Sequence, residues 1–366
     1  MTPEQSVDGL QGVIAYLNSV GITSVKQQHA KPPIAAAAKK LSDSGKLNAR
    51  VALSWTWMGP LEPMPLEEQK ETILNRAQYA SDLINTEFVK LSIDGNMGTT
   101  GYVVEPYLQS GDRGSPEFTD EELFEQIEYW DRMGMGVVGH AIADGSSRQM
   151  IDAIARVKEK HGKVNGRHQI AHAILIHPDD IPRMIDLDIT PEFSPVLWYP
   201  HEMAMATIPQ VGEERMKRWF PMNSVAKQGG RFVIASDGPV AWHDPLTSME
   251  LAITRRALGG KGDALSEDEG VDLATAIRAM TLDSAYLMDQ DQKVGSIEVG
   301  KRADMIVVDQ NLFDIPAEKI GASKVLLTLL DGRVVFDATS SPASQEAINE
   351  KFGVELDLSG EFSICR

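Results

Sequence analysis

The sequence predicts an α/β fold in which short parallel strands alternate with helices, and a (β/α)8 barrel is the favoured form. Seven β-rich runs are separated by helical stretches, which is the pattern of repeated βαβ units. Right-handed crossovers then allow a doubly wound sheet or a closed barrel. The chain has no G-x-G-x-x-G after a strand and no Walker lysine motif, so a nucleotide-binding doubly wound sheet loses support.

The expected elements follow in order from the first residues. Thr2 suits a helix N-cap and Pro3 the first helical position, and apolar residues then recur at helical spacing. The expected strands are Ile22–Val25, Arg50–Ser54, Phe88–Ile93, Gly136–His140, His168–Ala173, Ile189–Phe193 and Arg231–Ser236. The expected helices between them are Leu66–Ile84, Asp120–Met133, Ser147–His161 and Asp179–Leu187.

A small β module is expected after the barrel. Val294–Lys301 has the composition of a hairpin-like turn, and Asp331-Gly332 is a strong two-residue hairpin signal. The expected strands of this module are Ala303–Val308, Lys324–Leu330 and Val334–Phe336. We therefore divide the chain into a barrel over residues 1–290, a β-sandwich portion over 291–340 and a tail over 341–366 that includes a short amphipathic helix.

Composition and charge narrow the classes of function. The chain has 366 residues, of which 42% are apolar and 24% charged, as in ordinary globular proteins. Its net charge of −18 disfavours binding to nucleic acid or to an anionic membrane. No apolar run approaches the roughly 18 residues of a membrane helix. The first residues do not form a signal peptide, so we expect a cytoplasmic protein.

Four polar residues lie within or just after the apolar parts of four different expected strands: Lys90, His140, His172 and Asp237. The carboxyl ends of all strands in a (β/α)8 barrel open on one face, so we expect these side chains to converge there. The single cysteine, Cys365, excludes thiolate metal clusters. Any metal must therefore be held by His, carboxylate or lysine-derived ligands.

Five stretches resemble the metal-dependent amidohydrolase superfamily, specifically its amidohydrolase 3 (YtcJ-like) branch. They are Val89–Gly95, Gly139–Asp144, Arg167–Ala173, Ala235–Val240 and Gly295–Asp304, in the family's order. The resemblance implies a TIM barrel with a metal centre at its mouth and a small β-sandwich built from both chain ends.

The resemblance also implies roles for the four polar residues. By position, His140 and His172 resemble the metal ligands on strands five and six, and Asp237 resembles the strand-eight aspartate that binds metal and shuttles protons. Lys90 resembles the strand-four lysine that is carboxylated in many binuclear members. The implied cofactor is a divalent metal, Zn²⁺ in the first place, as one or two ions, because imidazoles and carboxylates suit it.

Two departures from the family pattern concern the metal site. The family has an H-x-H pair at the end of strand one, and none of the eight histidines of this chain forms one. Ile22–Val25 aligns with strand two, so we expect a TIM-type barrel that lacks strand one, as in a truncated chain. A partner or rearranged segment that fills the gap, or a natural remnant, are the alternatives. Ala171 stands where the family commonly has an acidic residue.

Several further residues allow two interpretations each. His201 and His243 follow the last two expected strands and are candidates for substrate binding. His29 follows an expected strand closely enough to reach the mouth, but a solvated loop position is favoured for it. Lys90 could pair with Asp94 instead of binding metal. The tryptophans that follow the expected strand Arg50–Ser54, namely Trp55 and Trp57, are expected in the core.

The sequence thus predicts a metal-dependent hydrolase of carbon–nitrogen bonds other than peptide bonds, acting on a small-molecule amide or formamide. In this mechanism hydroxide attacks the carbonyl and Asp237 carries the proton to the leaving amine. The alternative is a truncated or non-catalytic remnant that serves as a scaffold or interaction subunit. A phosphate-handling isomerase or aldolase would need a Gly-rich phosphate loop, which is missing. An unclosed barrel edge would favour homo-oligomers.

Overall fold

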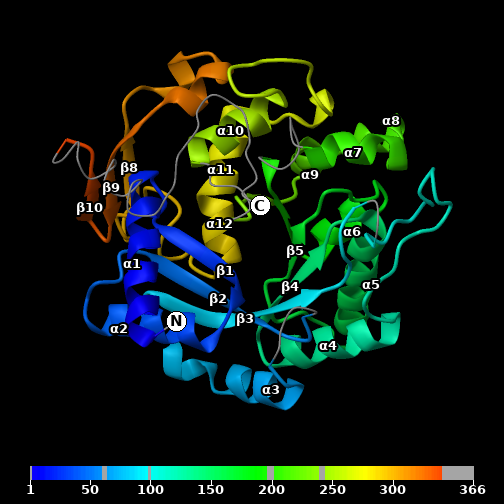
Figure 1. Ribbon diagram of the computed structural model, residues 1–366, viewed down its shortest axis with the longest axis horizontal. Helices are drawn as coiled ribbons and strands as arrows, with labels where there is room; N and C mark the ends of the chain where they lie inside the picture. Colours follow the sequence, from blue (N-terminus) through cyan, green and yellow to red (C-terminus); the bar gives the residue numbers. More distant parts are fainter. Residues whose placement is uncertain (1, 60–63, 98–99, 196–201, 239–243, 340–366) are drawn as a thin grey trace.

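Seven parallel strands form one sheet that curls into an open half-barrel (Figure 1). The computed structural model describes residues 2–59, 64–97, 100–195, 202–238 and 244–339. The strands pair in chain order: β1 (Ser24–Ala30), β2 (Arg50–Thr56), β3 (Ile84–Ser92), β4 (Gly136–Ala141), β5 (Gln169–His172), β6 (Thr190–Phe193) and β7 (Val233–Ile234). Among the described residues, β1 and β7 are the two edges of this sheet. The α/β half-barrel confirms the predicted fold class.

Helices connect the strands and cover the outside of the sheet (Figure 1). Up to β6 they are α1 (Pro3–Ser19), α2 (Pro32–Asp43), α3 (Leu66–Leu74), η1 (Arg76–Tyr79), α4 (Asp120–Arg132), α5 (Asp144–His161) and α6 (Asp180–Asp186). After β6 come α7 (Glu202–Val211), α8 (Glu213–Met216), α9 (Met222–Lys227), α10 (Pro245–Thr254), η3 (Glu267–Glu269), α11 (Leu273–Met280) and α12 (Leu282–Leu287). None of the helices in the described part of the chain combines the length and apolar composition that a membrane crossing requires.

Local signals account for where the helices begin. At α1, Thr2 and Gln5 form a capping box, in which the amide of each residue donates to the side chain of the other. The predicted start at Thr2 and Pro3 is therefore confirmed. The predicted helix Leu66–Ile84 is wrong in its second half, because Ala80 is extended and Ile84 already begins β3. The helix stops at Leu74 and a short 3-10 turn follows it.

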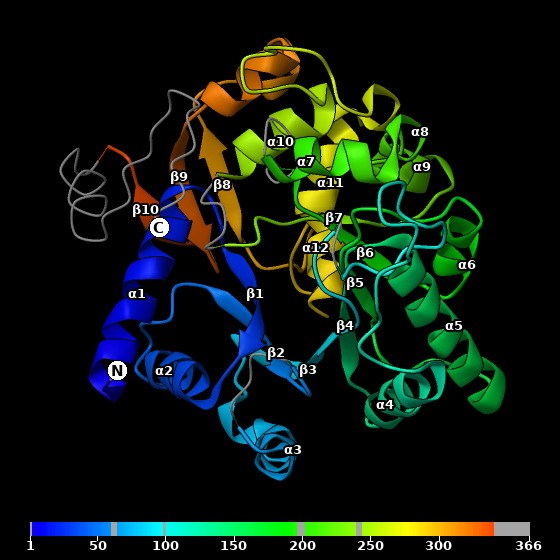
Figure 2. The ribbon, with the colours of Figure 1, turned by 45° about the vertical axis from the view of Figure 1, so that its right-hand side comes forward.

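Helix α12 lies beside the barrel sheet (Figure 2), and Met288, the residue after it, packs among the strands. Asn85, near the start of β3, donates to the carbonyl of Met288 at 3.0 Å. Met288 also packs in the interior against Ala52 of β2 and Phe88 of β3. The chain after the last barrel strand thus closes the end of the sheet opposite to the carboxyl ends of the strands.

A second, three-stranded antiparallel sheet lies beside α1 (Figure 1). It consists of β8 (Met305–Val308), β9 (Val325–Leu330) and β10 (Arg333–Asp337), and the 3-10 turns η4 (Leu312–Asp314) and η5 (Ala317–Ala322) precede β9. Asp331 and Gly332 both have positive φ, as the predicted two-residue hairpin requires. Residues 294–301 form turns without flanking strands, so the hairpin-like prediction there is wrong. The predicted helix of the tail lies outside the described residues.

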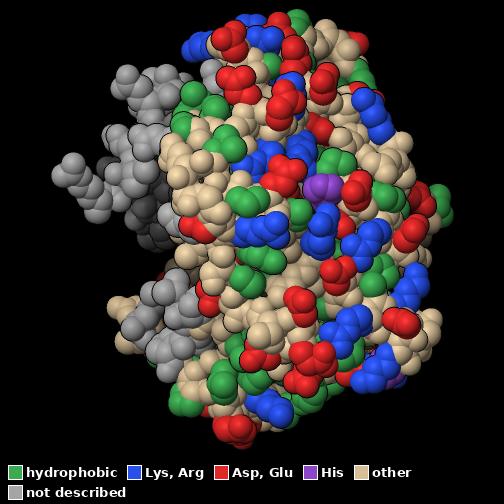
Figure 3. All heavy atoms as spheres, turned by 90° about the vertical axis from the view of Figure 1, so that its right-hand side faces the viewer, with side chains coloured by type: hydrophobic (Ala, Val, Ile, Leu, Met, Phe, Trp, Pro, Cys, Tyr) green, Lys and Arg blue, Asp and Glu red, His purple; other side chains and the backbone are tan. Residues whose placement is uncertain are grey.

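The face formed by the outer helices carries acidic and basic side chains in alternation (Figure 3). On it, Arg156 of α5 contacts Glu121 of α4 at 2.7 Å, and Lys160 contacts Glu128 at the same distance. Exposed pairs of this kind contribute little to stability individually. This face therefore has the mixed charge of an ordinary solvent-facing helix layer.

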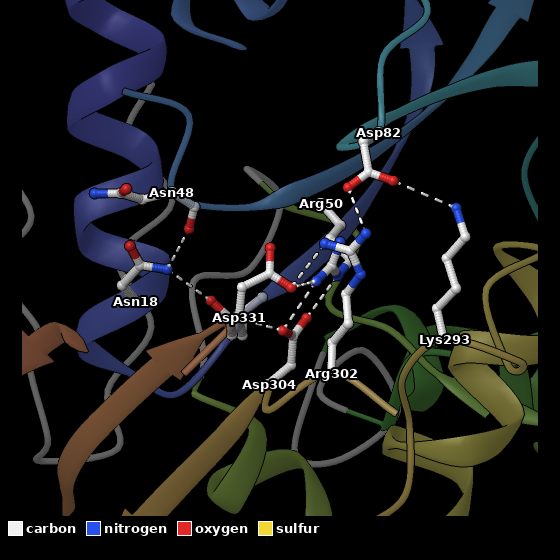
Figure 4. Close-up of polar contacts among 9 residues, drawn as sticks. Asn18, Asn48, Arg50, Asp82, Lys293, Arg302, Asp304 and Asp331 are labelled. Carbon is white, nitrogen blue, oxygen red and sulfur yellow. Dashed lines mark hydrogen bonds and ion pairs between the residues drawn. The ribbon is translucent and has the colours of Figure 1, made fainter. Parts of the chain in front are cut away.

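A buried arginine joins the small sheet to the barrel (Figure 4). Arg50, the first residue of β2, is fully buried and donates from Nε to Asp304 Oδ2 at 2.7 Å. Its Nη2 also donates to Asp304 and to Asp331 in the β9–β10 turn. Asp304 is the last residue of Gly295–Asp304, one of the five stretches that resemble the amidohydrolase superfamily. Its contact with Arg50 holds β8 against the barrel.

Replacing Arg50 with Met is expected to lower the free energy of unfolding by about 3–5 kcal/mol, because Asp304 stays buried without its counter-charge. Urea denaturation measures this. The control is Lys293→Ala, which removes only an exposed contact with Asp82 at 3.6 Å and should cost less than about 1 kcal/mol. Equal effects of the two substitutions would contradict the role of Arg50.

Candidate metal centre

Strand register brings the two predicted histidine ligands together. His140 in β4 is paired with Ser92 of β3, and His172 at the end of β5 is paired with Ala141 of β4. The two imidazole ring centres lie 4.5 Å apart with an edge-to-face arrangement. The carboxyl ends of β4 and β5 therefore present two imidazoles to the same small volume.

The predicted carboxylate and lysine lie at the same end of the sheet. Asp237, three residues after β7, has its Oδ2 4.0 Å from His172 Nδ1. Lys90 in β3 is 2% exposed, and its Nζ donates to Gln28 Oε1 at 2.8 Å. The charges of Lys90 and Asp237 are near enough to affect each other's pKa. The structure thus brings Lys90, His140, His172 and Asp237 near one another, and their roles stay predictions.

The backbone at two of these residues is strained. His172 has φ of 73°, Ala173 of 43° and Asp237 of 55°, in the left-handed region that residues other than glycine seldom adopt. Such conformations cost free energy and are concentrated at functional sites. They turn the side chains at the ends of β5 and β7 toward each other.

Burial keeps both imidazoles neutral. Desolvation, assisted by the nearby Lys90 cation, lowers the pKa of His140 to about 3. Desolvation also holds the pKa of His172 well below its usual value, and the neighbouring His140 adds to the effect. A neutral imidazole has the lone pair that a metal needs. Burial lowers the pKa of Lys90 to about 8 and raises the pKa of Asp237, where Lys90 opposes the rise.

Asp94 fastens the loop that follows His140. Its carboxylate accepts hydrogen bonds from the amides of Ile142 at 2.9 Å and Ala143 at 3.2 Å, and from the hydroxyl of Ser146 at 2.6 Å. It therefore holds the two residues that precede α5 and the hydroxyl of Ser146 in its first turn. Desolvation raises the pKa of Asp94 to about 6. Asp94 also accepts from the amide of Tyr102 at 3.2 Å, whereas Lys90 donates to Gln28.

The backbone of Gly95 forms a hydrogen bond with the His140 ring. Ligand imidazoles in metal sites commonly use their second nitrogen in this way, which fixes the ring orientation. Asp94 and Gly95 together therefore connect the end of β3 to the end of β4.

The donor set fits a divalent metal in its chemistry, but it is not gathered into a finished site. Two neutral imidazoles and a carboxylate are the ligands of many zinc centres. Among the described residues, however, no three His, Cys, Asp or Glu side chains form a group close enough to hold an ion. His140, His172 and Asp237 thus lie near one another without forming such a group.

The remaining predicted residues lie as follows. His29 is part of β1 rather than of a loop, and its exposed ring faces Thr56 Oγ1 at 3.5 Å. Trp55 and Trp57 are buried in the core, as predicted. The predicted substrate-binding residues His201 and His243 lie outside the described residues.

Sequence reasoning missed a set of polar side chains in the barrel interior. They are Lys26 and Gln28 of β1, Gln169 of β5 and Glu192 of β6. They are polar residues inside strands of a parallel sheet, where apolar residues are usual, and that departure is the signal that could have found them. Two of their hydrogen bonds, Lys26 to Gln169 and Gln28 to Glu192, join residues more than a hundred positions apart, for which a single sequence contains no information.

Comparison with known proteins agrees with this geometry. The profile described as the amidohydrolase family matches residues 1–336 of the chain. The chain belongs to the amidohydrolase family. It is 29% identical over 259 residues to a putative amidohydrolase, YtcJ, of Bacillus subtilis, a match that covers 68% of this chain and 47% of that protein.

The chain is also similar to a second curated protein and to a solved structure. The amidohydrolase chain is 25% identical over 228 residues to an N-substituted formamide deformylase of Arthrobacter pascens, covering 62% of this chain and 41% of that protein. A solved metal-dependent hydrolase of Pyrococcus horikoshii shares the fold, with a TM-score of 0.72 and 24% identity over 87% of this chain and 62% of that one. The chain spans about half the length of the curated relatives it matches.

Replacing His140 with Gln in the metal-free protein is expected to flatten the dependence of the unfolding free energy on pH. Folded His140 stays neutral down to about pH 3, whereas unfolded histidine binds a proton below its usual pKa of 6.5. The unfolded state therefore binds more protons in this window, and stability falls as the pH falls. Urea unfolding at several pH values from 4 to 7.5 measures the slope. An unchanged slope would show that folded His140 is protonated.

Proposed function

We propose that this amidohydrolase chain carries the catalytic side chains of a metal-dependent hydrolase of carbon–nitrogen bonds other than peptide bonds. The observation that carries the proposal is the convergence of Lys90, His140, His172 and Asp237 from four different strands. Family membership supports it. An amide or formamide is the substrate class, in line with the relative named as a formamide deformylase.

His140 and His172 would hold Zn²⁺ through neutral imidazoles, with Asp237 as the anionic ligand. This set favours zinc over Mg²⁺ or Ca²⁺, which prefer oxygen ligands only. Lys90 has no free lone pair as an ammonium. It would join the site as a carbamate, formed when its neutral amine adds to the carbon of CO₂ and loses one proton. Whether one or two ions bind depends on that step.

Asp237 would move the proton in the reaction. Zn²⁺, when bound, polarises the substrate carbonyl and lowers the pKa of a water to about 7. The Asp237 carboxylate would accept the proton of the attacking water and would donate it to the leaving nitrogen. In the chain without metal, burial raises the pKa of Asp237 and the Lys90 charge opposes the rise.

A non-catalytic role is the second candidate. The observation in its favour is that the described residues contain no group of three metal-binding side chains. A scaffold or interaction subunit would keep the fold and bind no stoichiometric zinc. Zinc content per chain therefore separates the two candidates.

Replacing Asp237 with Asn is expected to lower kcat for a formamide substrate by roughly 10²–10⁴-fold, the usual contribution of a positioned acid–base group. Asn keeps the shape of Asp but does not accept the proton. The measurement is formate release from a panel of N-substituted formamides by the zinc-loaded natural protein. The control is His161→Ala, on the outer helix α5, which should leave kcat unchanged. Equal kcat in Asp237→Asn and the parent protein would refute the proton-transfer role.

A further inference from the structure

Five polar side chains form a continuous hydrogen-bonded chain through the interior of the half-barrel: Lys26, Gln169, Glu192, Gln28 and Lys90. They come from β1, β3, β5 and β6. This interior chain lies one layer closer to the amino ends of the strands than the two histidines. Lys90 pairs with Val138, two residues before His140, and Gln169 precedes His172 by three residues on the same strand.

The interior chain is symmetric about Glu192. On one side, Gln28 Nε2 donates to Glu192 Oε2, and Gln28 Oε1 accepts from Lys90 Nζ at 2.8 Å. On the other side, Gln169 Nε2 donates to the same carboxylate oxygen, and Gln169 Oε1 accepts from Lys26 Nζ at 3.0 Å. Each lysine is thus connected to Glu192 through one glutamine amide.

The carboxylate determines which way both amides point. A glutamine side chain has a donating end and an accepting end, and an ionised carboxylate only accepts. Glu192 therefore attracts the NH₂ ends of Gln28 and Gln169, which leaves each carbonyl oxygen directed at a lysine. The orientation of these two carbonyl oxygens is therefore set by Glu192 and not by the lysines that donate to them.

Stability alone does not explain why the barrel interior contains these charged and polar side chains. Glu192 is 3% exposed and Lys90 2%, and buried charges are usually no more stabilising than apolar side chains of similar volume. Barrel interiors are normally packed with Val, Ile and Leu. A fully connected polar network does hold its members in defined positions, because each unmade hydrogen bond in the interior is costly.

We propose that Glu192 is a positioning residue that acts through Gln28 to hold the Lys90 amine on the inner side of the ligand cluster. Gln169 and Lys26 form the matching arm, which holds Glu192 from the opposite side of the interior. The inference rests on the proposed function for what Lys90 does there. The placement of the Lys90 amine is tested without metal or substrate.

The test is the reactivity of each lysine toward acetic anhydride in the metal-free full chain, measured by peptide mass spectrometry with the exposed Lys217 as internal reference. Glu192→Gln removes the negative charge, and its NH₂ group no longer obliges both neighbouring glutamines to turn their donors toward it, so the labelling of both Lys90 and Lys26 should rise. Gln28→Met should raise it at Lys90 alone, and Gln169→Met at Lys26 alone. Each rise should be about tenfold, the usual effect of losing a hydrogen bond to a charged group.

The control is Ser194→Ala, one residue beyond β6, because the buried hydroxyl of Ser194 has no hydrogen-bond partner among the described residues. It should leave both lysines protected. A general loosening of the fold would raise both lysines together in every variant, which would overturn the proposal. Unchanged labelling of Lys90 in Gln28→Met would overturn it too.

Two outcomes remain distinct in this design. If Glu192→Gln does not fold, which its melting curve shows, the opposite responses of Gln28→Met and Gln169→Met still decide the matter. If the variants show the expected labelling pattern but the parent protein binds no zinc, the proposed function fails and the positioning of Lys90 stands.

Discussion

The parallel pairing of β3, β4 and β5 decides which side chains meet at the candidate metal centre. It sets His140 beside Ser92 and His172 beside Ala141, so the two imidazoles share one end of the sheet. A slip of one residue in either pair would turn a histidine to the other face. Asp94 adds to this constraint, because it binds the loop after β4 from the loop after β3. His172 and Asp237 have positive φ within this set of strand pairings and loop contacts.

Buried charges connect parts of the chain that are far apart in sequence. Arg50 and Asp304 are separated by 254 residues, and their ion pair holds the small sheet on the barrel. Gln28 and Glu192 are separated by 164 residues, and their hydrogen bond crosses the interior beneath the histidines. The first contact fixes the position of a whole sheet, whereas the second fixes a single amine. In both, an unpaired partner would be left in the interior if the other were removed.

The sequence predicts the order and type of most elements, because apolar strands bounded by turn residues give a strong local signal. It also singles out Lys90, His140, His172 and Asp237, since each lies within or just after an apolar run, and their roles stay predictions. The helix expected up to Ile84 is wrong because apolar spacing alone does not show the extended residue Ala80. Glu192 and Asp94 were not predicted as hydrogen-bond centres, because their partners lie on other strands and loops. Such contacts exist only once the barrel has formed.

We propose that His140, His172 and Asp237 bind metal at the carboxyl ends of the strands, as a single ion or as a close pair. The most direct measurement is anomalous diffraction at the zinc absorption edge from crystals of the zinc-loaded protein. The account predicts a single strong peak, or a close pair of peaks, within bonding distance of the two imidazoles. A protein that takes up no zinc, or a peak at any other place, would contradict it.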